Sequence, residues 1–147
     1  MKDFDRWNTI KKEIDGYAEE MRPYFRAGEI WWVRLGVNVG YEIDGKREGF
    51  LRPAIVLKKY NQYSFLAVPL TTSAKPNPYR LPIGILNGRQ AFAMLSQLRN
   101  IDSKRLVEKI AFIEGDPFDV IKKEASRATV SRIPTAVGTC LGTKLRP

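Results

Sequence analysis

An arginine stands at the start of an apolar stretch, where the fold could hold its charge in a fixed position. Arg52 directly precedes Pro53, whose ring restricts the backbone at this step. The guanidinium group can bind a phosphate through two parallel hydrogen bonds, and it stays charged at any working pH. The alternative is an ordinary surface ion pair, with Glu42 or Glu48 as the partner. Arg52 is therefore a candidate anion ligand.

Three consecutive hydroxyl side chains follow a later apolar stretch. Thr71, Thr72 and Ser73 offer hydroxyl and backbone N–H groups, and Lys75 and Arg80 add positive charge shortly afterwards. The simpler interpretation is that the hydroxyls only mark the end of a strand. In a basic chain, the same residues could bind the phosphate of a nucleic acid.

Two more segments carry polar residues that could contact a ligand. Strand alternation would place Gln97 and Arg99 on one face of a strand end. A long polar loop, Gly36–Gly49, carries Tyr41 and Glu42. Long loops in small domains are often functional, and an exposed tyrosine can stack on a nucleic-acid base. We therefore expect a mobile loop that closes over a substrate.

The composition limits the chemistry that this chain can perform. Its 147 residues carry a net charge of +9, which favours polyanionic partners. There is no histidine and one cysteine, Cys140, so a Ser-His-Asp or Cys-His mechanism and an internal disulfide are excluded. The usual zinc ligands are lacking, and we expect no metal and no cofactor. No window approaches about 18 apolar residues, so we expect a cytoplasmic protein without a membrane partner.

The hydrophobic pattern predicts a helix, a series of short strands and a second helix. Apolar residues at steps of three or four predict a helix over residues 3–22, ended by Pro23. Strand-like composition covers residues 29–35, 53–58, 65–70, 79–83, 91–98 and 105–113. Asp116 is the expected N-cap of a helix that reaches residue 127, with Pro117 at its first position.

These elements predict one α+β, mainly β domain over residues 1–127. We expect a small, strongly bent β-barrel over residues 28–113, with an N-terminal helix and a C-terminal helix. Residues 128–147 would form a basic tail, which is either a flexible end or a phosphate-binding arm.

Five segments, in the same order, resemble the MazF/PemK (Kid-like) family of toxin endoribonucleases. They are Gly28–Val33, Gly40–Glu42, Arg52–Leu57, Val68–Ser73 and Leu95–Leu106. The predicted first helix and the tail lie outside this compact core. The chain departs from some relatives at Tyr41, where they have a histidine, and at Met94 and Ser96, where they have an arginine and an aspartate.

The resemblance implies a homodimeric, SH3-like barrel that is the toxin of a type II toxin–antitoxin system and cuts single-stranded RNA (mRNA) at short sequences. Arg52 and Thr71 match the family's catalytic pair, and Glu42 matches a glutamate implicated in some members. The residues that would contact RNA are Tyr41, Thr72, Ser73, Lys75, Arg80, Gln97 and Arg99. The implied partners are a cognate acidic antitoxin and, through that complex, operator DNA.

Such cleavage needs no metal, because RNA supplies its own nucleophile, the 2′-hydroxyl group. Arg52 would stabilise the developing charge, Thr71 would bind a phosphate oxygen, and Glu42 would act as the base. Two alternatives remain open. One is a non-catalytic toxin of the same fold that binds a protein target such as gyrase, and the other is a module that binds nucleic acid without cutting it.

Overall fold

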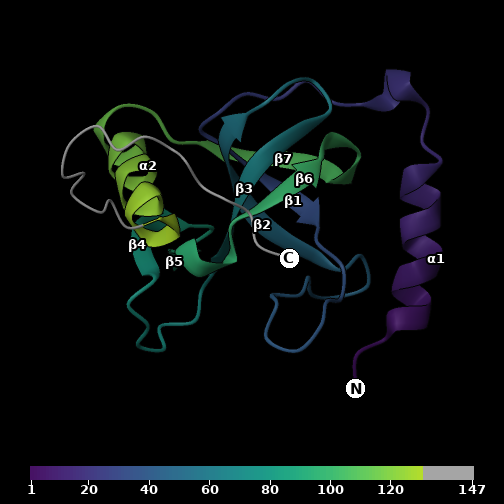
Figure 1. The fold of residues 1–147 in the computed structure, drawn as a ribbon, viewed down its shortest axis with the longest axis horizontal. Coiled ribbons are helices and arrows are strands. Elements are labelled where there is room, and N and C mark those ends of the chain that lie inside the picture. The colour runs from purple at the N-terminus through teal and green to yellow at the C-terminus, as the bar shows by residue number, and fades with distance from the viewer. Residues whose placement is uncertain (131–147) are drawn as a thin grey trace, which may run out of the picture.

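The computed structural model describes residues 1–130. In chain order, its elements are α1 (Phe4–Asp15), the 3₁₀ turn η1 (Glu19–Met21), β1 (Glu29–Arg34), β2 (Leu51–Lys59), β3 (Ser64–Thr71), β4 (Arg80–Leu86), β5 (Arg89–Met94), the 3₁₀ turn η2 (Leu95–Gln97), β6 (Arg99–Asp102), the 3₁₀ turn η3 (Ser103–Arg105), β7 (Leu106–Phe112) and α2 (Asp116–Thr129). The two α-helices lie on opposite sides of the strands (Figure 1). The predicted fold, a mainly β, bent barrel with a helix towards each end of the chain, is confirmed.

The strands of the described chain pair in antiparallel fashion in the order β4-β5-β3-β2-β1-β7, and β6 pairs with β3 beside this path. β3 therefore has two partners on one edge: its first half pairs with β6, and its end pairs with β5. Register shifts interrupt the β1–β7, β2–β3 and β4–β5 ladders. Because such bulges bend strands and increase their twist, the sheet curls into a partly closed barrel (Figure 1).

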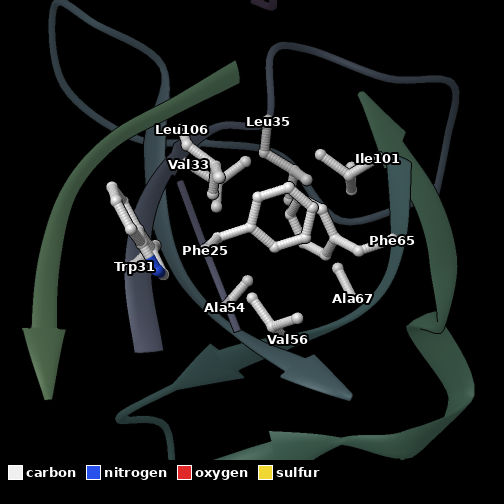
Figure 2. Close-up of a cluster of buried hydrophobic side chains, with 10 residues drawn as sticks. All are labelled: Phe25, Trp31, Val33, Leu35, Ala54, Val56, Phe65, Ala67, Ile101 and Leu106. Atoms are coloured by element: carbon white, nitrogen blue, oxygen red, sulfur yellow. The ribbon is translucent and has the colours of Figure 1, made fainter. Parts of the chain in front are cut away.

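The central strands β2 and β3 are buried on both faces, which explains why their sequences are continuously apolar. On one face, Val56 and Phe65 point into the barrel, where ten buried apolar side chains gather around Phe25 (Figure 2). On the other face, Ile55 packs in a cluster that includes Ile121 of α2. Burying one such side chain contributes about 1.5–3 kcal/mol. This double burial holds β2 and β3 rigidly, and with them the residues at their ends.

The first helix is shorter than predicted. α1 ends at Asp15 and is capped by Gly16, and the 3₁₀ turn η1 follows as a separate element. Glycine is a poor helix former, so the periodic pattern breaks there and not at Pro23. The predicted apolar stripe is real over α1 itself, where Trp7 and Ile14 are buried.

Other elements also differ from the prediction. Leu95–Gln97 form a 3₁₀ turn and not the end of a strand, and β6 is absent from the predicted strands. β6 has four residues, of which Ile101 alone is buried, so it carries too weak a pattern. α2 begins at Asp116 with Gly115 as its N-cap, and it continues to Thr129. Gly115 has φ +71°, a conformation that glycine adopts more readily than other residues.

The predicted basic tail begins within the last residues of α2, and its residues 131–147, including Cys140, lie outside the described residues. Within residues 1–130, no helix is long and apolar enough to cross a membrane.

Candidate anion-binding site

The register of β2 and β3 brings the two principal candidate residues together. The β2–β3 ladder ends with Ala54 paired to Pro69. Continuing this register by two residues would bring Arg52 opposite Thr71, and Arg52 Nη1 donates to the carbonyl oxygen of Leu70, the neighbour of Thr71. Residues directly opposite each other in an antiparallel pair point to the same face of the sheet, with Cβ atoms roughly 4.5–5.5 Å apart. The sheet therefore presents Arg52 and Thr71 side by side at one end.

Two backbone carbonyl groups hold Arg52. Its Nε donates to the Asp44 oxygen at 2.6 Å, and its Nη1 donates to the Leu70 oxygen at 3.0 Å. The residue is only 6% exposed. Burial lowers the pKa of Arg52; the charge of Asp44 raises this pKa, and the charge of Arg80 lowers it. The alternative of an ion pair with a loop glutamate is not formed, since no carboxylate in residues 1–130 lies within salt-bridge distance of Arg52.

Arg80, the first residue of β4, approaches the same place from the neighbouring loop. Its Nη1 donates to the Ser73 oxygen at 3.1 Å, the Ser73 Oγ at 3.2 Å and the Lys75 oxygen at 3.3 Å. Its Nε is buried, and no acceptor for it exists within the described part of the chain. A buried donor without an acceptor is rare in folded proteins.

Thr71 has a hydroxyl hydrogen that it can donate. Its Oγ1 accepts a hydrogen bond from the backbone N–H of Ser73 at 3.1 Å. A hydroxyl group also donates one hydrogen bond, and the described residues provide no acceptor for it. Thr71 is half-buried, so the hydroxyl is fixed by its neighbour and still reachable.

Arg52, Arg80 and Thr71 together form the candidate anion site. The two guanidinium groups lie close enough for the positive charge of Arg80 to lower the pKa of Arg52. Neither has a carboxylate partner among residues 1–130. Because an anion would relieve the repulsion between the two guanidinium groups and accept a hydrogen bond from the Thr71 hydroxyl, this group fits a phosphate.

The long loop between β1 and β2 is fixed against this site. Gln97 Nε2 donates to the Tyr41 oxygen at 3.1 Å, and Gln97 Oε1 accepts from the Ile43 N–H at 3.1 Å. The next residue, Asp44, supplies the carbonyl group that holds Arg52. Gln97 lies in η2, so the prediction that it shares a strand face with Arg99 is wrong.

Glu42 and Arg99 lie at a neighbouring pocket. This pocket of about 360 Å³ is lined by Asn38, Glu42, Ile43, Ser96, Gln97, Leu98 and Arg99. Burial lowers the pKa of Arg99, and the negative charge of Glu42 raises it. Glu42 Oε1 also accepts a hydrogen bond from the Val39 N–H at 2.9 Å. Glu42 therefore stabilises the charged form of Arg99, and its hydrogen bond to Val39 stabilises the backbone of the β1–β2 loop.

The three remaining predicted contact residues, Tyr41, Thr72 and Lys75, are exposed. Tyr41 is 99% exposed, as a residue that stacks on a base would be in the free protein. The structure thus gathers Arg52, Thr71, Ser73 and Arg80 in one place and brings Gln97 and the Glu42–Arg99 pair to its side.

One residue that the sequence does not single out contributes strongly. Besides holding Arg52 through its carbonyl group, Asp44 accepts the Asn38 N–H at 2.6 Å and pairs with Lys2 at 3.2 Å. Its position in a Gly-rich, charged loop gives no sign of this role. A backbone carbonyl group is present in every residue, so no sequence pattern reveals which one an arginine will use.

The family model for the PemK-like, MazF-like toxin of type II toxin–antitoxin systems matches residues 26–128, well over half of the chain. The chain belongs to this family. The five segments that resemble MazF/PemK all lie inside the matched region, and the predicted family is confirmed. The protein is therefore a MazF-type toxin of a toxin–antitoxin system. A comparison with curated protein sequences gives no significant match.

Solved structures agree with the MazF assignment. The crystal structure of MazF from Deinococcus radiodurans shares 25% sequence identity with the chain and superimposes with a TM-score of 0.58, over 71% of this chain and 96% of that one. MazF in a MazE–MazF structure from the same organism gives 23% identity and a TM-score of 0.53, over 71% and 94%. An endoribonuclease from a mycobacterial species shares only 12% identity but has the same fold, with a TM-score of 0.54 over 74% and 93%.

Proposed function

We propose that this toxin is a metal-independent endoribonuclease that cuts single-stranded mRNA at specific short sequences. The observation that carries the proposal is the pair of guanidinium groups, Arg52 and Arg80, beside Thr71, neither of which has a carboxylate partner in residues 1–130. The endoribonuclease of a mycobacterial species, which has the same fold, supports the proposal. The geometry fits a phosphate that is bound from three directions at once.

The reaction proceeds by attack of the RNA 2′-hydroxyl oxygen on the adjacent phosphorus. The bond from phosphorus to the 5′-oxygen breaks, leaving a 2′,3′-cyclic phosphate on one product and a 5′-hydroxyl on the other. Arg52 stabilises the charge that develops on the phosphate oxygens, and the Thr71 hydroxyl donates to one of them. Both donors are fixed before the substrate binds, which is the condition for a large electrostatic contribution.

Two protons must move in this reaction. The 2′-hydroxyl loses one to a base, and the 5′-oxygen gains one from an acid. Glu42 is the proposed base, since it lies two residues before Asp44, whose carbonyl group holds Arg52. Arg52 is the proposed acid. Tyr41, Thr72, Ser73, Lys75, Arg80, Gln97 and Arg99 are the proposed RNA contacts.

The proposed partners follow from the family. The D. radiodurans toxin has been solved together with MazE, and we propose that a cognate acidic antitoxin binds this toxin and blocks the basic site. The toxin would act as a homodimer in the cytoplasm and would meet operator DNA only through the antitoxin complex.

The test is cleavage of a single-stranded RNA in the presence of EDTA. We expect full activity without divalent metal, and products that carry a 2′,3′-cyclic or 3′-phosphate and a 5′-hydroxyl group. A substrate with 2′-deoxyribose at the cut site should bind but not be cut. Products with a 5′-phosphate, or a strict requirement for magnesium, would contradict the mechanism. Growth inhibition without any RNA cleavage would favour the non-catalytic toxin that binds a protein target.

A further inference from the structure

The N-terminal helix α1 precedes the family match at residues 26–128, yet it packs against the loop that serves the site. Trp7 and Ile14 form a buried cluster with Phe50, the last residue before β2. In Figure 1, α1 runs along one side of the barrel, with the N-terminus of the chain at the end nearest the β1–β2 loop. The helix is therefore a part of the site's surroundings that the family core does not contain.

Trp7 closes the base of the β1–β2 loop. Its ring packs edge-on against Phe50, with a centroid distance of 5.6 Å. A side chain at Gly36, which has φ +85°, would collide with the Trp7 ring. The backbone N–H groups of Leu35 and Gly36 both donate to the Phe50 oxygen, at 2.9 and 3.2 Å. Both ends of the loop thus meet under one tryptophan of α1.

Lys2 binds the outer part of the same loop. Its ammonium group donates to the Asn38 oxygen at 2.6 Å and the Gly40 oxygen at 2.9 Å, and it lies 3.2 Å from Asp44 Oδ2. An ammonium group has three donors, and here all three point to oxygens of residues 38–44. Lys2 is two-thirds buried at this contact, with 32% of its side chain exposed.

The loop is therefore held from two sides. Lys2, which precedes α1, and Trp7 of α1 hold it from one side. Gln97 of η2 holds it from the other through Tyr41 and Ile43. The segment between these anchors contains Glu42 and ends at Asp44, whose carbonyl group accepts the Arg52 Nε. A movement of the loop would remove that acceptor and would displace Glu42.

We propose that Lys2 is a positioning residue: the N-terminal segment formed by Lys2 and α1 acts as a strap that holds the β1–β2 loop in the closed arrangement that cleavage requires. This inference rests on the proposed RNA cleavage. It adds that residues outside the family core determine how well Arg52 and Glu42 are placed. Without the strap the loop opens, Arg52 gains freedom, and each binding event yields fewer cuts.

The test compares Lys2→Met with Lys11→Met. The first variant keeps the length of the side chain and removes its three donors. The control removes a charge from the exposed face of α1, where Lys11 makes no hydrogen bond or ion pair in the described structure. Hydrogen exchange of the Asn38 and Ile43 amides measures loop opening, single-turnover cleavage measures the chemical step, and RNA binding is measured separately.

Lys2→Met should accelerate exchange of the two loop amides about tenfold, the effect of roughly 1.4 kcal/mol. Exchange of the Val56 amide in β2 should stay unchanged, which shows that the barrel is intact. The single-turnover rate should fall about tenfold with little change in RNA affinity, and Lys11→Met should behave as the wild type.

Unchanged loop exchange, or faster exchange with an undiminished cutting rate, would overturn the proposal. An equal loss of RNA affinity in both variants, with no loss of rate, would also overturn it, because Lys2 would then supply only charge. If the wild-type protein cuts no RNA, the proposed function fails, and loop exchange alone decides whether Lys2 holds the loop.

Discussion

Two backbone carbonyl groups fix Arg52, and each accepts a hydrogen bond from a different nitrogen of its forked side chain. Its Nε and Nη1 donate to two different carbonyl groups, those of Asp44 and Leu70, and its third nitrogen, Nη2, is the donor proposed to contact the phosphate. A lysine carries the same charge at a single point and cannot reach both carbonyl groups and a phosphate. The shape of the guanidinium group therefore matters here as much as its charge.

We expect Arg52→Lys to lower the single-turnover cleavage rate by roughly 10²-fold, about 2.7 kcal/mol, as for loss of a preorganised donor to a developing oxyanion. The melting temperature should fall as well, because one carbonyl group loses its buried donor. Retention of more than half of the wild-type rate in a folded Arg52→Lys protein would mean that charge alone suffices.

The neighbouring threonines provide a matched pair of variants. Thr71 Oγ1 accepts the Ser73 N–H at the end of β3, whereas Thr72 is exposed. We expect Thr71→Val, which keeps the shape of the side chain, to lower the cutting rate about 10–100-fold. The loss is smaller than for the arginine because a neutral donor is weaker than a charged one. Thr72 is a proposed RNA contact, so Thr72→Val should weaken RNA affinity but leave the rate at saturating RNA within about twofold of wild type. Equal losses of rate in the two variants would contradict a specific role for Thr71.

At the scale of elements, the sheet positions the site, and the start of β1 depends on one buried carboxylate. Glu29 is 3% exposed and accepts hydrogen bonds from the Arg26 N–H at 2.5 Å and from Trp31 Nε1 at 3.3 Å. Lys109 of β7 lies 3.2 Å from its other oxygen. Burial by itself raises the pKa of Glu29, but these hydrogen bonds and the charge of Lys109 together lower it below the usual value.

A folded-state pKa below the unfolded one gives stability that is present above the unfolded pKa and lost as the pH falls through the folded pKa. We therefore expect Glu29→Gln to reduce the free energy of unfolding by about 1–3 kcal/mol at pH 7. The difference from wild type should shrink below pH ~4, where the carboxylate begins to be protonated. Urea denaturation at both pH values measures it. The exposed Glu108→Gln on β7 is the control, and an equal effect of the two variants would refute the assignment.

The sequence predicts the strands that carry the site but not the contacts that complete it. β2 and β3 are long apolar runs bounded by polar residues, so the sequence pattern alone places Arg52 and Thr71 at strand ends. β6 escapes prediction because its four residues include one buried side chain. The hydrogen bond from Arg52 to Asp44 cannot be predicted from the sequence, because it uses a backbone carbonyl oxygen. The role of Lys2 cannot be predicted either, because it depends on packing between segments that are distant in the sequence.

At the scale of the whole molecule, the family core and the added helix have separate tasks. The core supplies the curled sheet that brings Arg52, Thr71 and Arg80 together, and the same fold can serve more than one function. α1 lies before the matched region and touches the core through the β1–β2 loop and through η3, where Lys104 Nζ donates to the Asp15 oxygen at 2.9 Å. We therefore expect differences in activity between this toxin and relatives without such a helix to arise from differences in how the β1–β2 loop is held.

The contact of Lys2 with the loop has a practical consequence for work on the purified toxin. Lys2 is the second residue of the sequence, so an affinity tag fused ahead of Met1 lies within a few residues of the side chain that binds Asn38 and Gly40. Such a tag changes the surroundings of Lys2 at the outset, and a weakly active preparation could then be mistaken for an inactive protein. Placing the tag at the other end of the chain, or removing it before the assay, avoids this error.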